Sequence, residues 1–367
     1  MFNTPIILGV AHLWFSQTKN KINGLKVETQ VDLTSSLTFH VPALTSHYVG
    51  VDKDDDIREA LNYAQNNNLE ILILGGGSNM LFHNDFEGLV IKINSKGVDV
   101  SSDDGRRLEV VVEAGEDWHE FVLKSLANGW GGLENLALIP GCVGASPMQN
   151  IGAYGVEIKD VFSWLEAIEI KTGQLKRFNL KECKFDYRES VFKRELKGDW
   201  VIVRVAYNLD RESPLKTSYG AIEDEISEIN KMDLTHLDVA KAVIKIRNSK
   251  LPNPDIIGNA GSFFKNPIVN KEDFNKLKEV YPEIPNYPLD GEVVKLAAGW
   301  LIDTSGWKGH DRGTHGVHEH QALVLVNHGG ATGKEVWALA EDIMQSVKEK
   351  YNIQLEPEVN QISIDKS

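Results

Sequence analysis

The chain has 367 residues, about two and a half times the ~150 of a typical domain, so two or three packed units are expected. Hydrophobic residues make up 42% and charged residues 25%, which is typical of a globular protein and excludes a disordered one. The 39 Lys and Arg against 53 Asp and Glu leave a net charge of -14. Because this charge repels phosphate backbones and anionic lipids, no nucleic-acid or membrane partner is expected.

Cysteine content and the N-terminal segment favour a cytoplasmic protein. The two cysteines, Cys142 and Cys183, cannot form a disulfide framework and do not form a CxxC pair. The apolar stretch 6–15 is shorter than the ~20 residues that cross a bilayer, and it lacks the flanks of a secretory signal. Residues 1–33 are expected to be an appended N-terminal extension of unassigned role.

In chain order, the first predicted elements form a β-α-β unit. Its parts are strand 47–51, helix 54–68 beginning at an acidic cluster, and strand 69–74. The Val- and Ile-rich strands and the amphipathic helix that follow are 89–93, 108–115, helix 117–129, 164–170 and 200–209. The pattern breaks at 210–220, which predicts a domain boundary near residue 212.

Beyond that boundary, helices and strands are partly segregated. The predicted helices and strands of the second half are helices 233–250, 293–306 and 332–352, and strands 322–327 and 355–363. Thr332 and Glu335 form a capping box at the start of the last helix. The fold class expected from this content is α+β.

The run GGGSNM, Gly75 to Met80, follows a predicted strand and could cradle a pyrophosphate, because glycines let backbone N–H groups approach a phosphate. It is not a Rossmann fingerprint, since Met80 replaces the third glycine and a strand follows. GGATGKE, from Gly329, is not a P-loop, because it is one residue short and ends in Glu335. An ordinary tight turn is the alternative for GGGSNM.

The segment 133–157 is long and rich in glycine, with the amides of Gln149 and Asn150 between its glycines. Such a loop can present many N–H and C=O groups to a flat polar heterocycle. An Ω-loop that packs on itself is the alternative. The length and the amide content favour a ligand site.

Two further segments carry chemistry-bearing side chains. Ser262, in the segment 258–267, lies in a glycine-lined stretch without a GxSxG elbow, so it is either a proton or hydrogen-bond donor or part of a hairpin turn. A histidine-rich segment offers either a transition-metal site or polar side chains facing a substrate or water; the expectation is no metal. Its residues are His310, Asp311, His315, His318, Glu319 and His320.

Seven motifs in fixed order resemble the UDP-N-acetylenolpyruvoylglucosamine reductase (MurB) family. They are GGGSNML, ENLALIPGCVGASPMQNIGAYGVE, CKFDYRESVFK, LPNPDIIGNAGSFFKNP, KLAAGWLID, HQALVLVN and LEPEV. The resemblance covers residues 37–363, and TSYG at Tyr219 is similar to the longer, type I branch. The fold it implies is an FAD-binding domain of the vanillyl-alcohol-oxidase (PCMH) type at 34–212 and a smaller α/β substrate-binding domain at 213–363.

The resemblance also implies non-covalent FAD and NADPH as cofactors, with NADPH using the same cleft as the substrate. The residues that it assigns to FAD are Gly75, Gly76, Gly77, Ser78, Asn79, Ile139, Pro140, Gly141, Gly144, Ala145, Asn150, Gly152, Tyr154 and Gly155. Leu37 replaces an asparagine of the family pattern, which puts one hydrogen bond near the flavin in doubt. His40 suggests covalent attachment of the flavin as an alternative, but the reductase family binds FAD non-covalently.

The activity implied is reduction of UDP-N-acetylglucosamine enolpyruvate to UDP-N-acetylmuramate in a bacterial cytoplasm, by a monomer. Arg188 is expected to bind the charged intermediate, Ser262 to donate a proton, and Glu358 to act as an acid or hydrogen-bond donor. Substrate contacts carry over to Tyr219, Lys250, Asn266 and Gln321. Without the resemblance, Lys250 reads as a solvated lysine at a helix end, and Arg188 and Glu358 as surface charges.

Two other functions remain open at this point. A flavin oxidase of the same fold would act on a sugar alcohol, but it needs a base and an oxygen path rather than a proton donor. A non-catalytic flavin or nucleotide-sugar sensor would bind the ligands without turnover. The trio Ser262, Arg188 and Glu358 favours the reductase over both.

Overall fold

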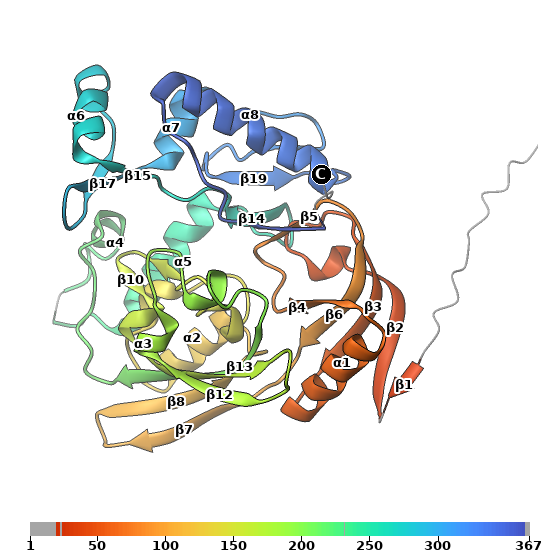
Figure 1. Cartoon of the computed structure of the whole chain (residues 1–367). Coiled ribbons are helices and arrows are strands. Elements are labelled where there is room, and N and C mark those ends of the chain that lie inside the picture. Colours follow the sequence, from red (N-terminus) through yellow and green to blue (C-terminus); the bar gives the residue numbers. More distant parts are fainter. Residues whose placement is uncertain (1–19, 23, 231, 364–367) are drawn as a thin grey trace, which may run out of the picture.

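The computed structural model describes residues 20–22, 24–230 and 232–363 (Figure 1). The first sheet has the order β1-β2-β3-β6-β4. Its strands are β1 (Asn20–Ile22), β2 (Leu25–Asp32), β3 (Leu44–Val51), β6 (Phe86–Ile93) and β4 (Glu70–Leu74). β2 pairs with β3 and buries Val27, so residues 25–32 are part of this sheet. The expected division of the chain at residue 33 stays a prediction. Residues 1–19 lie outside the described residues.

The predicted β-α-β unit is confirmed. β3 and β4 both run parallel to β6 and lie on either side of it, with α1 (Asp54–Asn66) as the connection. Three aspartates in the first turn of α1 complement the positive end of the helix dipole. One face of α1 buries Ile57, Ala60, Leu61 and Ala64.

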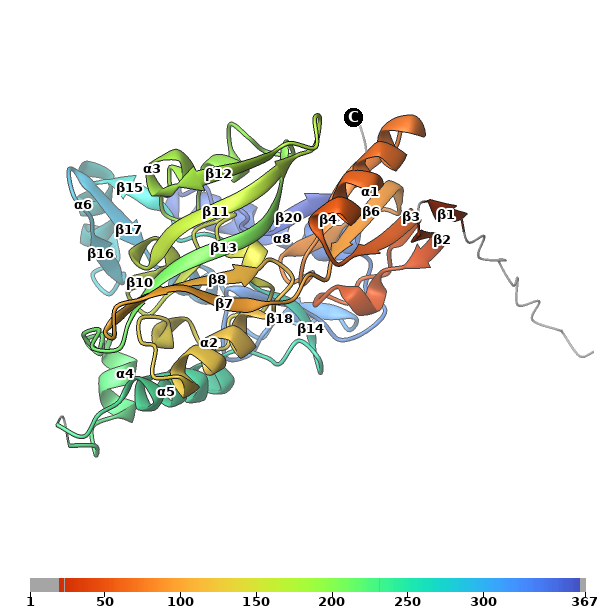
Figure 2. The same ribbon diagram turned by 90° about the horizontal axis from the view of Figure 1, so that it is seen from below.

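The second sheet is antiparallel, with the order β12-β11-β13-β8-β7 (Figure 2). Its strands are β12 (Leu175–Asn179), β11 (Phe162–Glu169), β13 (Trp200–Asp210), β8 (Arg107–Glu113) and β7 (Val98–Asp103). Successive residues of β13 enter different cores, because neighbouring side chains point to opposite faces. Val201 and Val203 pack in the core that contains α1, whereas Ile202 packs in the core that contains α2 (Trp118–Ala127).

Two helices beyond residue 212 pack against this second core. α4 (Gly220–Glu225) contributes Ile222, and α5 (His236–Lys250) contributes Val239, Val243 and Ile246. α5 is the predicted helix 233–250 with a shorter N-terminal end, set by the Thr235–Asp238 capping box. The division of the chain at residue 212 stays a prediction.

The C-terminal part contains two small sheets and three helices that lie together in Figure 1. One sheet is β14 (Gly258–Ser262), β19 (Val324–Asn327) and β18 (His315–Val317); the other is β15 (Ile268–Asn270), β17 (Val293–Leu296) and β16 (Asn286–Pro288). The helices are α6 (Lys271–Val280), α7 (Ala298–Thr304) and α8 (Gly333–Tyr351). Their core continues into the face of the first sheet opposite α1.

The expected helix 293–306 is wrong in its first part. Residues 293–296 form β17, and only α7 is helical. β17 is paired on both edges, with β15 and with β16, and this pairing satisfies its backbone groups outside any helix. The branched side chains of Val293 and Val294 also favour a strand.

A short pair of parallel strands joins the C-terminal segment to the first part of the chain. β5 (Met80–Phe82) pairs with β20 (Asn360–Ile362), so the C-terminal segment lies beside the glycine-rich run 75–79. The remaining short elements are β9 (Gly152–Ala153), β10 (Val156–Glu157) and α3 (Leu180–Cys183). None of the helices in the described part of the chain combines the length and the apolar character that a bilayer crossing requires.

The capping box predicted for α8 is present and gives a stability test. The Thr332 hydroxyl accepts from the Glu335 backbone N–H at 3.3 Å, and the Glu335 carboxylate accepts from the Thr332 N–H at 2.8 Å. Thr332→Ala is expected to lower the free energy of unfolding by ~1 kcal/mol, measured by chemical denaturation. Thr332→Ser keeps the acceptor and should keep most of the stability; an equal loss in both variants would contradict the capping role.

Candidate active site

Three chain segments meet so closely at the glycine-rich run that side chains are excluded there. A Cβ at Gly76 would lie 2.6 Å from Gly141 Cα, and a Cβ at Gly77 would lie 2.0 Å from the carbonyl oxygen of Ser36. The Ser78 hydroxyl donates to the Pro140 carbonyl at 3.2 Å. The two loops assigned to FAD, 75–79 and 139–155, are therefore in direct contact.

The glycine-rich run presents backbone donors without a partner. Among the described residues, no acceptor is found for the backbone N–H groups of Gly76, Gly77 and Ser78. Lys92 donates to the carbonyl of Gly75, which adds positive charge beside the loop, and burial lowers the pKa of Lys92. Free N–H donors, a nearby cation and exclusion of side chains fit a pyrophosphate such as that of FAD.

Gly77→Ala is expected to weaken FAD binding at least ~10-fold. Gly77 has φ of 64°, a conformation that costs a non-glycine residue about 1–3 kcal/mol, and its added Cβ meets backbone that must move. Equilibrium titration of apoprotein with FAD measures the change. Gly220→Ala, where no atom lies within 4 Å of the added Cβ, is the matched control. Unchanged affinity in Gly77→Ala would contradict the cradle.

The second loop ends in a tight hairpin that projects a tyrosine. Tyr154 and Gly155 connect β9 to β10, and both have positive φ, 50° and 80°, as a type I′ turn requires. The ring of Tyr154 lies edge-on to that of Tyr219, with centroids 5.3 Å apart. Burial lowers the pKa of Arg247, and the nearby Tyr154 opposes this.

Asn150 is fully buried, and its amide is used inside the protein. Its Nδ2 donates to Glu157 Oε2 and to the carbonyl of Asp186, both at 3.1 Å, and its Oδ1 accepts from the Lys159 N–H at 3.2 Å. The side chain therefore anchors the turn that carries Arg188. The predicted contact of Asn150 with the flavin can use only the hydrogen-bonding groups of Asn150 that these three bonds leave free.

Arg188 lies in a two-residue turn between Asp186 and Glu189, which exchange backbone hydrogen bonds of 3.1 Å. Its φ of 55° is unusual for a residue with a side chain, and such strain is often found at functional sites. The Arg188 Nε lies 3.2 Å from Glu358 Oε1, but it is not aligned as a hydrogen-bond donor. The two groups therefore approach closely without a hydrogen bond, and their side chains are 23% and 10% exposed.

Backbone pairing brings Glu358 to the end of the strand that carries Ser262. The Glu358 N–H donates to the carbonyl of Phe263 at 2.8 Å, and Phe264 forms a bridge with Pro357. Ser262 follows a bulge in β14, where Gly261 has φ of 68°. Within the described residues its partly buried hydroxyl has no hydrogen-bond partner. The three residues expected to be catalytic thus come from segments in contact.

Two amides connect this carboxyl to the glycine-rich run. Gln149 Nε2 lies 3.2 Å from Glu358 Oε1, and Asn79 Nδ2 lies 3.1 Å from Gln149 Oε1 and 3.2 Å from the Glu358 carbonyl. The loop expected to hold FAD and the carboxyl expected to assist catalysis are therefore part of one hydrogen-bond network.

Cations and aromatic rings surround the Arg188 turn. Lys295 Nζ lies 4.7 Å from the centre of the Tyr187 ring and 5.6 Å from that of Tyr287. Burial, together with the charge of Arg188, lowers the pKa of Lys295, and Glu157 opposes this. Although the chain has a net charge of -14, this region is locally basic. It suits an anionic ligand with a flat ring.

The four residues expected to contact the substrate do not lie in one place. Asn266 Oδ1 accepts from the Ala298 N–H at 2.9 Å, and Gln321 Oε1 lies 3.2 Å from a Cβ built at Gly299, so both are at the N-terminal end of α7. Tyr219 is 46% exposed beside Tyr154. Lys250 is exposed at the end of α5, and no described residue pairs with it. These surroundings are those of a solvated lysine at a helix end.

Sequence reasoning missed several residues of this region. The sequence distinguishes Gln149 only as part of an amide-rich loop, and it predicts a helix for Lys295, which lies on β17. Tyr187 and Lys193 flank Arg188 within the motif CKFDYRESVFK, so this motif was the available signal. Their contacts join segments far apart in sequence, which no local pattern reveals.

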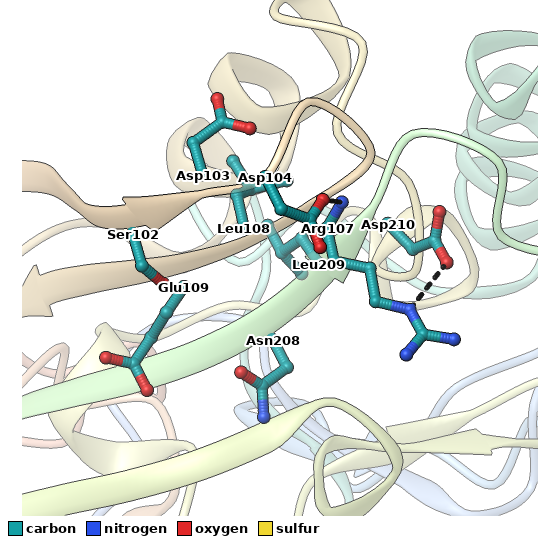
Figure 3. Close-up of a pocket in the computed structure, with 9 residues that line it drawn as sticks. All are labelled: Ser102, Asp103, Asp104, Arg107, Leu108, Glu109, Asn208, Leu209 and Asp210. Atoms are coloured by element: carbon teal, nitrogen blue, oxygen red, sulfur yellow. Dashed lines mark hydrogen bonds and ion pairs between the residues drawn. The ribbon is translucent and has the colours of Figure 1, made fainter.

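A surface depression of about 570 Å³ lies elsewhere, on the second sheet (Figure 3). Its lining comes from β7, β8 and β13 and contains none of the expected site residues. Its carboxylates are engaged: Arg211 binds Asp103 at 2.8 Å, and Arg106 binds Asp210 at 3.1 Å. The depression is therefore not the candidate active site.

The histidine-rich segment does not gather ligands in the described structure. Within residues 20–363, apart from 23 and 231, no group of three His, Cys, Asp or Glu side chains is arranged to hold a metal ion. His315 is buried on β18, and burial lowers its pKa. The rings of His318 and His320 stack edge-on, with centroids 5.5 Å apart.

Comparisons with known proteins agree with this geometry. Residues 45–179 match the model of an FAD binding domain, and residues 252–362 match that of the UDP-N-acetylenolpyruvoylglucosamine reductase C-terminal domain. Reductases of that name from Pseudomonas fluorescens (strain Pf0-1) and Amoebophilus asiaticus are 47% and 46% identical over 336 residues, which is 92% of this chain and 99% of theirs.

Among solved structures, the UDP-N-acetylenolpyruvylglucosamine reductase of Thermus caldophilus superposes with a TM-score of 0.63. The match covers 92% of this chain and 98% of that one, at 22% identity, and supports the fold. It agrees with an FAD-binding part of the vanillyl-alcohol-oxidase type followed by a smaller domain. From the identity and coverage of its relatives, the chain belongs to the UDP-N-acetylenolpyruvoylglucosamine reductase family.

Proposed function

We propose that this chain is an NADPH-dependent flavoenzyme that reduces UDP-N-acetylenolpyruvoylglucosamine, the enolpyruvyl sugar named above, to UDP-N-acetylmuramate. Membership of the reductase family and the FAD binding domain support this assignment. The observation that carries it is the Arg188–Glu358 pair, which stands where the glycine-rich run, the Arg188 turn and the end of β14 meet. The negative charge and the two separate cysteines favour a cytoplasmic enzyme without nucleic-acid partners.

FAD, when bound, would supply the hydride-transfer chemistry that links NADPH to the terminal enolpyruvyl carbon. The backbone N–H groups of Gly76, Gly77 and Ser78 would hold its pyrophosphate, beside Lys92. The loop 139–155 would line the flavin, with its glycines keeping the backbone close to it. These assignments rest on the mutual contact of the two loops.

Arg188 would stabilise the negative charge that builds up on the substrate. Hydride addition leaves an enolate next to the substrate carboxylate, so two anionic groups share one site. A guanidinium presents several N–H donors in a planar fork and suits this pair of anions better than an ammonium. Because Arg188 Nε is not aligned with Glu358, the N–H groups of Arg188 are available for the substrate.

Ser262 would deliver the proton that completes the reduction. Its hydroxyl makes no hydrogen bond to a described residue, so it is free to point to a substrate carbon. A hydroxyl is a weak acid in water, but an enolate carbon is a strong base. A hydroxyl held close to that carbon can therefore protonate it. Glu358, 8% exposed, would donate a hydrogen bond to the developing enolate.

Binding of the nucleotide part would use the basic and aromatic surroundings of the Arg188 turn. Lys250 and Tyr219 would contact the diphosphate and the uridine, and Asn266 and Gln321 would act from the end of α7. Lys295, with its ammonium beside the Tyr187 ring, adds local positive charge. This charge explains how a protein of net charge -14 can admit anionic ligands.

Mass spectrometry of the product tests the proposed reaction. With NADPH and the enolpyruvyl sugar under anaerobic conditions, each NADPH oxidised should yield one sugar nucleotide that is heavier by two hydrogens. NADPH oxidation that instead consumes oxygen and leaves the sugar unchanged would indicate a flavin oxidase. Binding of both ligands without any conversion would indicate a sensor.

A further inference from the structure

Lys193, the last residue of the 3₁₀ turn Val191–Lys193, is a partly buried lysine to which the proposed reaction assigns no role. Its Nζ lies 3.4 Å from Gln149 Oε1 and 3.5 Å from the carbonyl oxygen of Arg188. No carboxylate of the described residues lies within ion-pair distance of it. Burial and the charge of Lys265 lower the pKa of Lys193, and Glu189 and Glu358 oppose this.

The position of Lys193 fixes the orientation of the Gln149 amide. A lysine ammonium only donates hydrogen bonds, so the amide atom that faces it must be the oxygen. Asn79 Nδ2 donates to the same oxygen at 3.1 Å. The NH₂ group of Gln149 then faces Glu358 Oε1, at 3.2 Å.

This orientation makes the two oxygens of Glu358 unequal. Oε1 receives the Gln149 N–H and lies 3.2 Å from the Arg188 guanidinium, so that side of the carboxyl already faces a donor and a cation. A proton on Oε1 would face both of these groups, whereas a proton on Oε2 would not. The proton that the proposed function requires of Glu358 therefore belongs on Oε2.

We propose that Lys193 is a positioning residue that, by orienting Gln149, directs the acidic proton of Glu358 to Oε2. The proposal rests on the proposed function, since it concerns the step in which Glu358 donates to the substrate. Lys193 also holds the carbonyl of Arg188, so one side chain supports both members of the Arg188–Glu358 pair. Lys193 would therefore act through Gln149 and Arg188 rather than on the substrate directly.

The test separates the two half-reactions of the FAD-loaded enzyme in anaerobic stopped-flow experiments. Lys193→Met should leave reduction by NADPH unchanged and slow reoxidation by the enolpyruvyl sugar about 10- to 100-fold, the scale of a hydrogen bond to a charged group. Gln149→Leu should slow reoxidation to a similar extent. Because both residues act through one contact, the double variant should be no slower than the slower single variant. Lys193→Arg, which keeps the cation, should restore most of the rate.

Three results would overturn the proposal: an unchanged reoxidation rate in Lys193→Met, equal slowing of both half-reactions, or additive losses in the double variant. If Lys193→Met does not retain FAD, Gln149→Leu and Lys193→Arg decide by the same criteria. Failure of the unmodified enzyme to be reoxidised by the enolpyruvyl sugar would instead refute the proposed function.

Discussion

Ser262→Ala is expected to slow reoxidation of the reduced enzyme by the enolpyruvyl sugar by ~10²-fold or more, the usual contribution of a general acid. Reduction by NADPH should proceed at the normal rate, because it requires no proton from Ser262. The loss of one oxygen atom from a partly buried position should leave the fold intact. Anaerobic stopped-flow absorbance measures the two half-reactions separately.

Ser249→Ala is a matched control for this substitution. Ser249 lies near the end of α5, and its hydroxyl donates to the Ile246 carbonyl at 2.9 Å. This variant should show normal rates in both half-reactions. Equal slowing of both half-reactions in Ser262→Ala would show that Ser262 is structural rather than the proton donor.

Arg188→Lys is expected to slow the same half-reaction by about 10²-fold, because an ammonium cannot hold two anionic groups through a planar fork. The positive φ of Arg188 strains lysine as much as arginine, so the substitution changes the charged group and not the backbone cost. Reduction by NADPH should again be normal. The measurement is the ratio of the two rate constants in the variant and in the parent enzyme.

Arg194→Lys is the control, because it replaces a guanidinium by an ammonium outside the candidate site. Arg194 is exposed, and its guanidinium donates to the Lys184 carbonyl at 2.9 Å. This variant should retain both rates. Full activity of Arg188→Lys would remove Arg188 from the proposed catalytic set.

Local features of the fold could be predicted because short-range signals determine them. The acidic first turn of α1 and the capping box at Thr332 both specify helix starts, and both are present. The β17 region could not be predicted in this way. Val293–Leu296 is a strand because β15 and β16 flank it, and this pairing depends on residues elsewhere in the chain.

The sequence predicts which residues belong to the candidate site better than it predicts the contacts between them. Gly75–Asn79 stood out because three glycines follow a strand, and the structure adds that Gly76 packs against Gly141. The assignment of Arg188 and Glu358 depends on the resemblance alone, since isolated charges carry no local signal. Ser262 also lies in a glycine-lined stretch that suggests a donor. The contact between Lys193 and Gln149 joins residues 44 positions apart and required the structure.

Anaerobic absorbance spectroscopy of the purified protein tests the central claim most directly. We expect a bound flavin whose visible absorbance disappears when NADPH is added and returns when the enolpyruvyl sugar is added. Recovery of the absorbance with oxygen but not with the sugar would contradict the reductase assignment. A colourless protein that cannot take up FAD would contradict the cofactor assignment on which the proposed mechanism depends.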